Sequence, residues 1–333
     1  MKTAFIDLNF HLEQTKSSQF FIDLCRQHFD DFHLVGANEA WYTIPRLKPD
    51  TLILWQSMFQ PEEIDSWQAK NVILIPMMDD VQLTDAYWNK YKPYKVFCFC
   101  KKLYDFLNER GFSVFYSQYY MKPHFHKATE NKPDVFFWER SSLINWQLVK
   151  KLLNGTDVAS LHYHYATNIS DKNNDRPTQD DIGKYNITFS DWFESQDEYT
   201  QLLHKTDLYI APREKEGIGL SFIEALAEGC VVAAYNDATM NEYITDGADG
   251  FLFTEQNAKP FVLKSVAFCR LQEASHKRAE NGWETWNKNI PQLFAFFDTP
   301  MSHYSPQKAP GIYIFKRIRS EIRHIYKKLC RHR

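Results

Sequence analysis

Two glutamates in the carboxyl-terminal half of the chain, Glu216 and Glu224, are separated by seven residues that include Gly217 and Gly219. Glycines let a ligand approach the backbone closely, and a helix that begins there presents unpaired N–H groups. The pattern predicts a ligand site in which two carboxylates line one crevice at different depths. The alternative is that the glutamates only complement a helix dipole and that the glycines only make a turn.

The surrounding residues predict the elements that position these side chains. Residues 207–212 form a short apolar run typical of a parallel strand, and the charged residues 213–216 form a turn at its carboxyl end. A helix then runs from the two glycines to about residue 228. In open α/β sheets, ligands bind where strand ends and helix amino termini converge.

The sequence of this segment resembles a known family. Residues 216–235 read EGIGLSFIEALAEGCVVAAY, and NEYI and DGADGFLF follow at residues 241–244 and 246–253. They are similar to the donor-sugar half of retaining GT-B glycosyltransferases of the "group 1" family, most closely over residues 207–253 and less closely over 134–206. The resemblance implies the GT-B fold, in which two doubly wound Rossmann-like domains face each other across a cleft.

The resemblance also implies roles for single residues. Glu216 would bond hydroxyls of the transferred sugar, and Glu224 would bond the ribose of the nucleotide. Transfer would retain the anomeric configuration, and the family usually needs no metal or cofactor. The departing phosphate would take the acceptor proton at the front side, so no separate general base would be required. Further donor contacts are expected at Gly217, Ile218, Gly219, Leu220 and Ser221, and at Trp192, which could stack on the nucleobase or equally pack.

The diphosphate of the donor would be met by Arg140, in the strand-then-arginine element VFFWER, because an arginine fork fits phosphate oxygens. The alternative is an ordinary surface arginine. The family commonly has a lysine five residues later, and this chain has Asn145 there. The candidates to supply the missing charge are Arg213, Lys215 and Lys150, and Lys215 is favoured because it lies beside the glutamate turn.

Length and patterning indicate an α/β protein of two domains. The chain has 333 residues, which suits two domains of about 150 residues each. Strand-like runs alternate with helical patterns in both halves, as in doubly wound parallel sheets. We predict domains at residues 1–127 and 128–290, followed by a crossing segment and tail at 291–333. The predicted strands are residues 3–8, 32–35, 51–55, 71–76, 95–100 and 113–116, then 134–138, 158–164, 185–189, 208–212, 231–235 and 250–253.

The amino-terminal domain is expected to bind the acceptor through loops at its strand ends. The family's glycine-rich turn after the first strand is absent, and LNFHLEQTKSS stands in its place. The candidates follow the first, third and fourth predicted strands, and they are Asn9, His11, Gln56, Asp79 and Asp80. For the two aspartates, capping of the next helix is an alternative.

The last residues form a separate electrostatic segment. Residues 316–333 contain eight Lys or Arg and one acid, so they carry +7, although the whole chain carries −3. Apolar residues recur at three- to four-residue steps from Ile312 to Leu329, which predicts a basic amphipathic helix. Residues 312–333 are therefore expected to bind an anionic membrane surface. The alternative is that the apolar stripe packs on the amino-terminal domain.

The sequence also allows predictions of the cellular location and of metal binding. The start MKTAFIDLNF lacks a signal-peptide core, and no stretch approaches the roughly 20 apolar residues that cross a bilayer. A cytoplasmic protein, peripheral on the inner face of the membrane, is expected, with no nucleic-acid partner. His124 with His126, and His162 with His164, lack partners at ligand spacing, so no metal site is predicted and these are read as strand or hinge histidines.

Three functions agree with these patterns. The first is a transferase that extends a lipid-linked surface polysaccharide or lipopolysaccharide precursor. The second is a glycosyltransferase for a soluble or protein acceptor. The third is a catalytically silent GT-B module that binds a glycan or a partner protein. The glutamate pair favours an enzyme, whereas Asn145 in place of lysine keeps the third alternative open.

Overall fold

The computed structural model describes residues 1–124, 132–165, 176–261, 263, 265–301, 304–306, 318, 319 and 322. The chain divides into two compact units, Met1–Ser117 with Asn289–Arg333, and Gln118–Lys288. The predicted domain boundary near residue 128 and His126 lie outside the described residues. So do most of residues 312–333.

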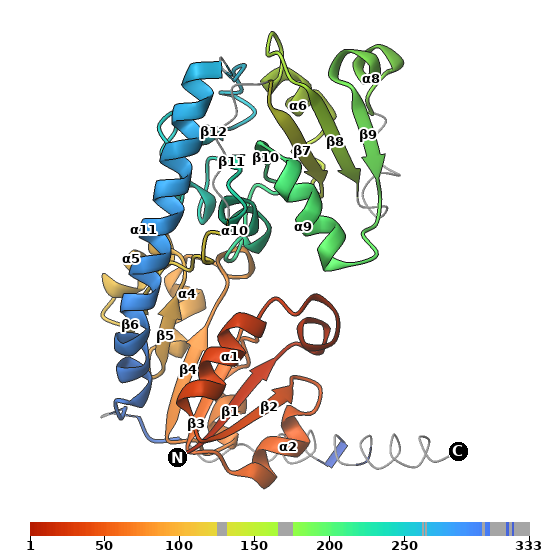
Figure 1. The fold of residues 1–333 in the computed structure, drawn as a ribbon. Coiled ribbons are helices and arrows are strands. Elements are labelled where there is room, and N and C mark those ends of the chain that lie inside the picture. Colours follow the sequence, from red (N-terminus) through yellow and green to blue (C-terminus); the bar gives the residue numbers. More distant parts are fainter. Residues whose placement is uncertain are drawn as a thin grey trace. The chain divides into compact units, whose positions relative to one another are not determined.

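The first unit is built on a parallel sheet with a single change of direction. Its six strands are ordered β2-β1-β3-β4-β5-β6, so the chain starts at β1, adds β2 on one side and continues from β3 on the other (Figure 1). The switch point therefore lies between β1 and β3. The strands are β1 Lys2–Asp7, β2 Asp31–Gly36, β3 Thr51–Trp55, β4 Asn71–Ile75, β5 Lys95–Cys98 and β6 Ser113–Tyr116.

Short helices connect these strands. They are η1 His11–Thr15, α1 Gln19–His28, α2 Ala40–Leu47, α3 Pro61–Ser66, η2 Met78–Asp80, α4 Asp85–Trp88, η3 Asn89–Tyr91 and α5 Lys101–Asn108. Aromatic rings fill the space between the sheet and α1: Phe21 lies 5.7 Å from Phe97, ring centre to ring centre, and 6.4 Å from Phe5. Burial of such large apolar side chains is the main force that holds the helix on the sheet.

The second unit repeats the topology. Its six parallel strands are ordered β12-β11-β10-β7-β8-β9, so its switch point lies between β7 and β10. The strands are β7 Asp134–Glu139, β8 Ser160–Tyr165, β9 Ile187–Ser190, β10 Leu208–Ile210, β11 Val231–Tyr235 and β12 Phe251–Phe253. The helices are α6 Trp146–Leu152, α8 Gln179–Tyr185, α9 Gln196–Lys205, α10 Leu220–Ala227, η4 Met240–Glu242 and α11 Ser265–Asp298.

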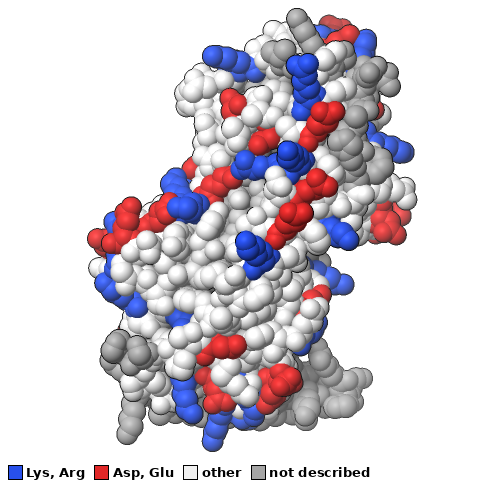
Figure 2. Space-filling view, turned by 60° about the vertical axis from the view of Figure 1, so that its left-hand side comes forward, with Lys and Arg blue, Asp and Glu red and all other residues white. Residues whose placement is uncertain are grey.

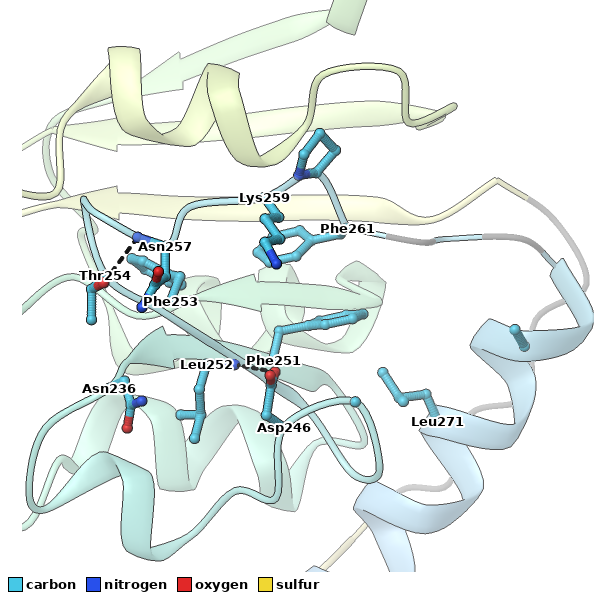
Figure 3. A pocket seen from close by; sticks show the side chains of 13 residues that line it. Asn236, Asp246, Phe251, Leu252, Phe253, Thr254, Asn257, Lys259, Phe261 and Leu271 are labelled. Carbon is cyan, nitrogen blue, oxygen red and sulfur yellow. Dashed lines mark hydrogen bonds between the residues drawn. The ribbon is translucent and has the colours of Figure 1, made fainter.

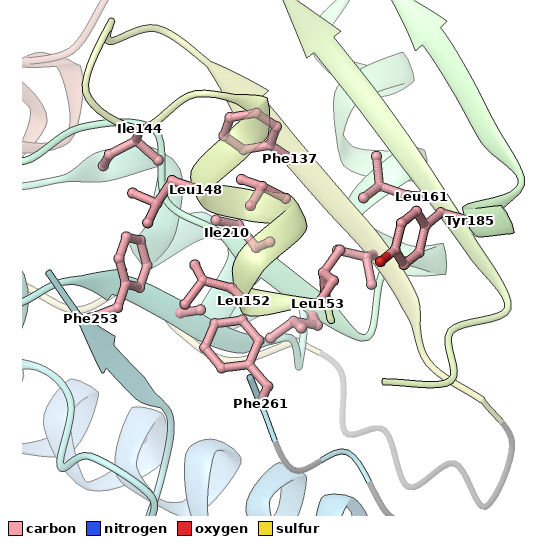
Figure 4. Close-up of a cluster of buried hydrophobic side chains, with 14 of the residues drawn as sticks. Phe137, Ile144, Leu148, Leu152, Leu153, Leu161, Tyr185, Ile210, Phe253 and Phe261 are labelled. Atoms are coloured by element: carbon pink, nitrogen blue, oxygen red, sulfur yellow. The ribbon is translucent and has the colours of Figure 1, made fainter. Parts of the chain in front are cut away.

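Alternation along the strands of the second sheet divides its core between two faces. Leu208 and Ile210 point into a cluster with Phe137 and with Leu148 and Leu152 of α6 (Figure 4). The residue between them, Tyr209, lies on the opposite face, where it contacts Phe136. Side chains that are two apart along a strand share a face, which is why both faces of this sheet are buried.

The long helix α11 ends in the core of the first unit. Its residues from Asn289 onward are part of that unit, and Leu293 and Phe297 are fully buried. The amine of Lys95, at the start of β5, donates to the carbonyls of Phe296 and Phe297 at 2.7 and 3.1 Å, and to that of Thr299. A cation at the carboxyl end of a helix satisfies its unpaired carbonyls and complements its dipole.

All the predicted strands are present, and their ends differ from the prediction by a few residues at most. The prediction of two doubly wound parallel sheets is confirmed. None of the described helices is long and apolar enough to cross a membrane.

Candidate active site

The carboxyl ends of β7 and β10 carry two charged loops at the switch point of the second sheet. The loops line a hollow of about 520 Å³, formed by Arg140, Ser141, Ser142, Arg213, Glu214 and Lys215. The Ser141 hydroxyl donates to the Glu214 carboxylate at 2.6 Å, so the two loops are tied together. Open α/β sheets bind their ligands at this position, outside the carboxyl ends of the strands where the strand order reverses.

Two arginines bring positive charge to this hollow. Burial and the charge of Arg213 lower the pKa of Arg140, whereas the nearby Glu216 carboxylate opposes this shift. The Arg140 guanidinium lies 4.8 Å from the centre of the Trp138 ring, and Arg213 Nη1 lies 3.9 Å from Glu216 Oε2. Two cations that are close enough for one to lower the pKa of the other favour an anionic ligand.

The backbone of the predicted ligand turn is fixed from a second loop. The Thr239 side chain is fully buried, and its hydroxyl lies 2.6 Å from the carbonyl of Glu216 and 2.8 Å from that of Gly217. Thr239 comes from the segment after β11. The turn that carries Glu216 is therefore positioned by a hydrogen bond from a neighbouring strand end.

Gly219 occupies a position that only glycine fits. Its φ is 81°, in the left-handed region, and a Cβ built there would lie 2.0 Å from Cε1 of Phe222. The residue immediately precedes α10, and its carbonyl accepts from the N–H groups of Phe222 and Ile223. The glycine thus serves the start of the helix, as well as any close approach of a ligand to the backbone.

Glu224, one turn inside α10, lies in an environment that disfavours its charged form. Burial raises the pKa of its carboxyl to about 7, and the charge of Glu228 acts in the same direction. A hydrogen bond with Tyr199 of α9 opposes the shift. Buried carboxyls with raised pKa values are common at functional sites, although structural networks also produce them.

Asn145 stands where the family has a lysine, and the structure shows what it does. Its side-chain oxygen accepts from the N–H of Leu148 at 3.1 Å, so Asn145 is the N-cap of α6. Lys150 forms an ion pair with Asp181 at 2.7 Å. Among the three candidates for the missing charge, Arg213 and Lys215 line the hollow, and Lys150 is not one of its lining residues.

Trp192 lies apart from these loops in the sheet order. It follows β9, the edge strand, whereas the hollow is lined by loops that follow β7 and β10. Its side chain is 77% exposed. The next residue, Phe193, stacks on His164 with ring centres 4.2 Å apart. A role of Trp192 at a nucleobase stays a prediction.

The acceptor candidates of the first unit follow β1, β3 and β4, which are neighbours in its sheet. Asn9 contacts Glu39 and the N–H of Asn38, so its side chain holds the loop after β2. Gln56 has a φ of 55°, which is uncommon for a residue other than glycine. His11 lies in η1 and bonds to Asp7.

Asp79 and Asp80 lie in the turn η2 and are exposed. The helix that follows, α4, is capped by Thr84, whose side chain accepts from the N–H of Tyr87. The alternative that the two aspartates cap the next helix is therefore wrong. Their role in acceptor binding stays a prediction.

The histidine pair in β8 has a structural partner. His162 and His164 lie in β8 and both bond to the Ser190 hydroxyl at 2.7 Å. Burial lowers the pKa of His164 to about 4. Over the described residues, no group of three or more histidine, cysteine or acidic side chains is arranged to hold a metal ion.

A second hollow of about 500 Å³ lies beside the edge strand β12 (Figure 3). Its lining includes Phe251, Phe253 and Phe261, with Asp246 accepting from the N–H of Leu252 at 2.9 Å. The residues that line it do not include any of the predicted donor residues. Its lining has one cation, Lys259, and one carboxylate, Asp246, so it is less suited to a diphosphate than the arginine-lined hollow.

Some residues that shape the site could not be predicted from the sequence. Thr239 and Tyr199 lie in segments far from the glutamate pair in sequence, and their types are ordinary for a loop and a helix. Only the sheet topology, which brings the ends of β10 and β11 together, reveals Thr239. Arg213 is one of the three candidates to supply the charge of the missing lysine. Its position beside Arg140 makes it a better candidate than Lys150.

Comparisons with known proteins agree with this geometry. Residues 171–285 match the model of the family described as Glycosyl transferases group 1. The range contains the segment 207–253, so the resemblance seen in the sequence is confirmed. No curated protein matches the sequence.

Several solved structures share the fold. Anabaena HepE, in complex with UDP and glucose, is 13% identical with a TM-score of 0.61, covering 89% of this chain and 99% of that one. A glycosyltransferase from Rickettsia africae is 12% identical with a TM-score of 0.60, covering 91% and 99%. Sucrose-phosphate synthase from Thermosynechococcus elongatus is 12% identical with a TM-score of 0.57, covering 89% and 98%. The GT-B fold predicted from the sequence is thus confirmed.

Proposed function

We propose that the protein moves a sugar from a nucleotide-sugar donor to a glycan acceptor, because residues 171–285 match the model of the group 1 glycosyltransferases. The observation that carries this proposal is the arginine-lined hollow beside the Glu216 turn, at the switch point of the second sheet. A diphosphate supplies the anion that two adjacent arginines favour, and a sugar supplies hydroxyls for the carboxylate.

Each donor-side residue has a role in this proposal. Arg140 binds the diphosphate and stabilises the charge that develops on it as the glycosidic bond breaks. Glu216 accepts hydrogen bonds from hydroxyls of the transferred sugar, and Glu224 from those of the ribose. The backbone from Gly217 to Ser221 completes the donor site. UDP is the first nucleotide to test, because HepE, which has a similar fold, was solved in complex with it.

Transfer is proposed to retain the anomeric configuration and to need no metal. The departing phosphate takes the proton of the acceptor hydroxyl on the same face of the sugar, so no separate general base is required. The proposal is tested by NMR analysis of the product anomer and by activity in the presence of EDTA. An inverted product, or activity lost with EDTA and restored by a divalent cation, overturns it.

The acceptor is proposed to be a lipid-linked precursor of a surface polysaccharide or lipopolysaccharide. The tail supports this: Ile318 and Ile322 belong to the apolar stripe predicted from the sequence, and they are 47% and 61% exposed. On the face shown in Figure 2, acidic and basic side chains of the described residues are interspersed. The excess of basic charge at residues 316–333 is a local feature of the sequence, because this segment carries +7 whereas the whole chain carries −3.

Two measurements test the function and the acceptor class separately. Calorimetric titration with UDP, GDP, ADP and their sugar conjugates, followed by product analysis, tests donor use. Absence of all nucleotide binding favours the silent GT-B module. Deletion of residues 312–333 should release the protein from phosphatidylglycerol vesicles but leave nucleotide binding intact. Unchanged vesicle binding favours a transferase for a soluble or protein acceptor.

A further inference from the structure

The loop after β1 contains a buried carboxylate that holds a histidine in one orientation. Asp7, the last residue of β1, is fully buried. Its Oδ1 lies 2.8 Å from Nδ1 of His11 and accepts from the N–H of Leu8 at 2.6 Å, and its Oδ2 accepts from the Ser18 hydroxyl at 2.5 Å. Both oxygens of Asp7 are therefore occupied, and the imidazole ring is held by one of them.

This arrangement fixes which nitrogen of His11 carries the proton. An ionised carboxylate can only accept hydrogen bonds, so Nδ1 must be the donor in the contact with Asp7. In the neutral ring, Nε2 then has a free lone pair and acts as an acceptor. Nε2 makes no hydrogen bond to the part of the chain that the structure describes, and the side chain is 13% exposed. The lone pair of Nε2 can therefore accept a hydrogen bond from a ligand hydroxyl.

Two apolar side chains beside this histidine are exposed. Phe10 is 54% exposed and Leu8 is 37% exposed, and the Phe10 and His11 rings lie 6.2 Å apart, centre to centre. An exposed aromatic ring next to an oriented hydrogen-bond acceptor matches a sugar, which has one apolar C–H face and a rim of hydroxyls. In ligand sites, apolar side chains commonly supply the contact area, and a few polar groups fix the orientation of the ligand.

The position of the loop in the fold is also that of a ligand site. The segment His11–Thr15 is a π-helix, a rare element that is frequent at functional sites. It follows β1, one of the two strands at the switch point of the first sheet (Figure 1). Gln56, with its left-handed φ of 55°, follows β3, the other strand of that switch point. Ile6 of β1 lies beside Leu54 of β3, so both loops start at the same edge.

We propose that Phe10 and His11 form a binding site for a hexopyranosyl residue of the acceptor, in which His11 Nε2 accepts a hydrogen bond from a sugar hydroxyl. Asp7 is a positioning residue that selects the tautomer of His11. The inference rests on the proposed glycosyltransferase function and extends it to the acceptor. It assigns the acceptor class as a sugar with an accessible C–H face, recognised by its hydroxyl.

The test uses the full-length protein with UDP and a panel of methyl α- and β-glycosides of glucose, galactose, mannose and N-acetylglucosamine. Saturation-transfer NMR should show contact with at least one of them. In His11→Gln and Phe10→Ala, the affinity for that glycoside should fall at least about tenfold, whereas UDP affinity stays unchanged. His33→Gln is the matched control, because His33 bonds to Asp31 at 2.6 Å in a similar pair on the exposed edge strand β2.

A second variant separates the two sugar sites of the protein. A glycoside signal that survives Glu216→Gln but is lost in His11→Gln supports the proposal. A signal lost in Glu216→Gln and kept in His11→Gln belongs to the donor site and overturns the proposal, as does the absence of any glycoside contact with the wild-type protein. If the wild-type protein binds no nucleotide or nucleotide sugar, the proposed function fails independently of the glycoside result.

The role of Asp7 has its own readout. Nitrogen-15 NMR of the imidazole should show the Nδ1–H tautomer of His11 in the wild-type protein. Asp7→Asn can donate from its amide to Nδ1, which should shift the ring toward the Nε2–H tautomer and weaken glycoside binding as much as His11→Gln does. An unchanged tautomer with unchanged binding overturns the positioning role. Ser18→Ala, which removes a different bond to Asp7, should leave the tautomer intact.

Discussion

Arg140 and Arg213 follow two neighbouring strands, β7 and β10, and the charge of Arg213 contributes to lowering the pKa of Arg140. Like charges so close repel each other, and a bound anion relieves this repulsion. The pair therefore offers a substitute for the lysine that the family has where this chain has Asn145. Asn145 itself caps α6 and carries no charge.

We expect Arg213→Gln to weaken the binding of UDP by about 10- to 100-fold, since charge-assisted hydrogen bonds contribute roughly 1.5–3 kcal/mol each. Calorimetric titration measures the change. Lys215→Gln should have a smaller effect, because Lys215 is exposed. Lys150→Gln is the control with no expected effect on UDP, and equal losses in all three variants would contradict a specific role for Arg213.

Glu216→Gln should lower kcat by at least about 100-fold, because the amide would replace the carboxylate that, in the proposed role, orients and polarises sugar hydroxyls in the transition state. The affinity for free UDP should be unchanged, since UDP lacks the transferred sugar. The comparison of kcat with the UDP dissociation constant checks both statements. Transfer at the wild-type rate would remove Glu216 from the donor site.

Stability should depend on pH through Glu224. Its pKa in the folded protein is about 7, above the ordinary value of 4.5. Between these values the folded state binds a proton that the unfolded state lacks, so the free energy of unfolding falls as pH rises and levels off above about 7. Glu224→Gln should remove this slope and, above pH 7, stabilise the protein by up to about 3 kcal/mol. Chemical denaturation at about pH 5 and about pH 8 measures it.

The same titration should affect ligand binding. In the proposed donor site, the ionised form of Glu224 would accept two hydrogen bonds from ribose hydroxyls, whereas the protonated form would have to donate in one of its contacts. The affinity for UDP should therefore rise as pH increases through about 7. In Glu224→Gln this rise should be absent, and a pH profile parallel to that of the wild-type protein would show that another group titrates.

Gly219→Ala should destabilise the protein through backbone strain and through a steric clash, and Gly155→Ala is a control that separates the two effects. Both Gly219 and Gly155 have a left-handed φ, of 81° and 72°, but a Cβ meets Phe222 at 2.0 Å only at Gly219, and nothing within 4 Å at Gly155. Gly155→Ala should cost on the order of 1 kcal/mol from backbone strain alone. Gly219→Ala should cost more, measured by thermal unfolding, and an equal cost at both positions would contradict the steric contribution.

The fold was accessible from the sequence because its signals are local. Apolar runs such as residues 51–55 and 231–235 mark strands by composition alone, and the observed β3 and β11 have these same bounds. Glu216 and Glu224 were found because the turn and helix between them are contiguous in sequence. Their spacing does not depend on the rest of the protein.

The partners of these residues could not be predicted in the same way, because they come from distant segments. Thr239 reaches the Glu216 turn from the loop after β11, and Tyr199 reaches Glu224 from α9. The role of Asp7 was also hidden, since an aspartate at a strand end has many ordinary uses. Its bonds to His11 and Ser18 appear only when η1 folds over the end of β1.

The return of α11 to the first unit also sets the order of events during synthesis. Leu293, Phe294 and Phe297 belong to the core under the first sheet, yet the ribosome makes them after the whole second unit, Gln118–Lys288, is complete. Domains generally fold as units while the chain emerges. The first unit therefore cannot complete its core before the second unit has been translated. Until α11 has been synthesised, part of the apolar face of the first sheet stays uncovered and must be protected from aggregation.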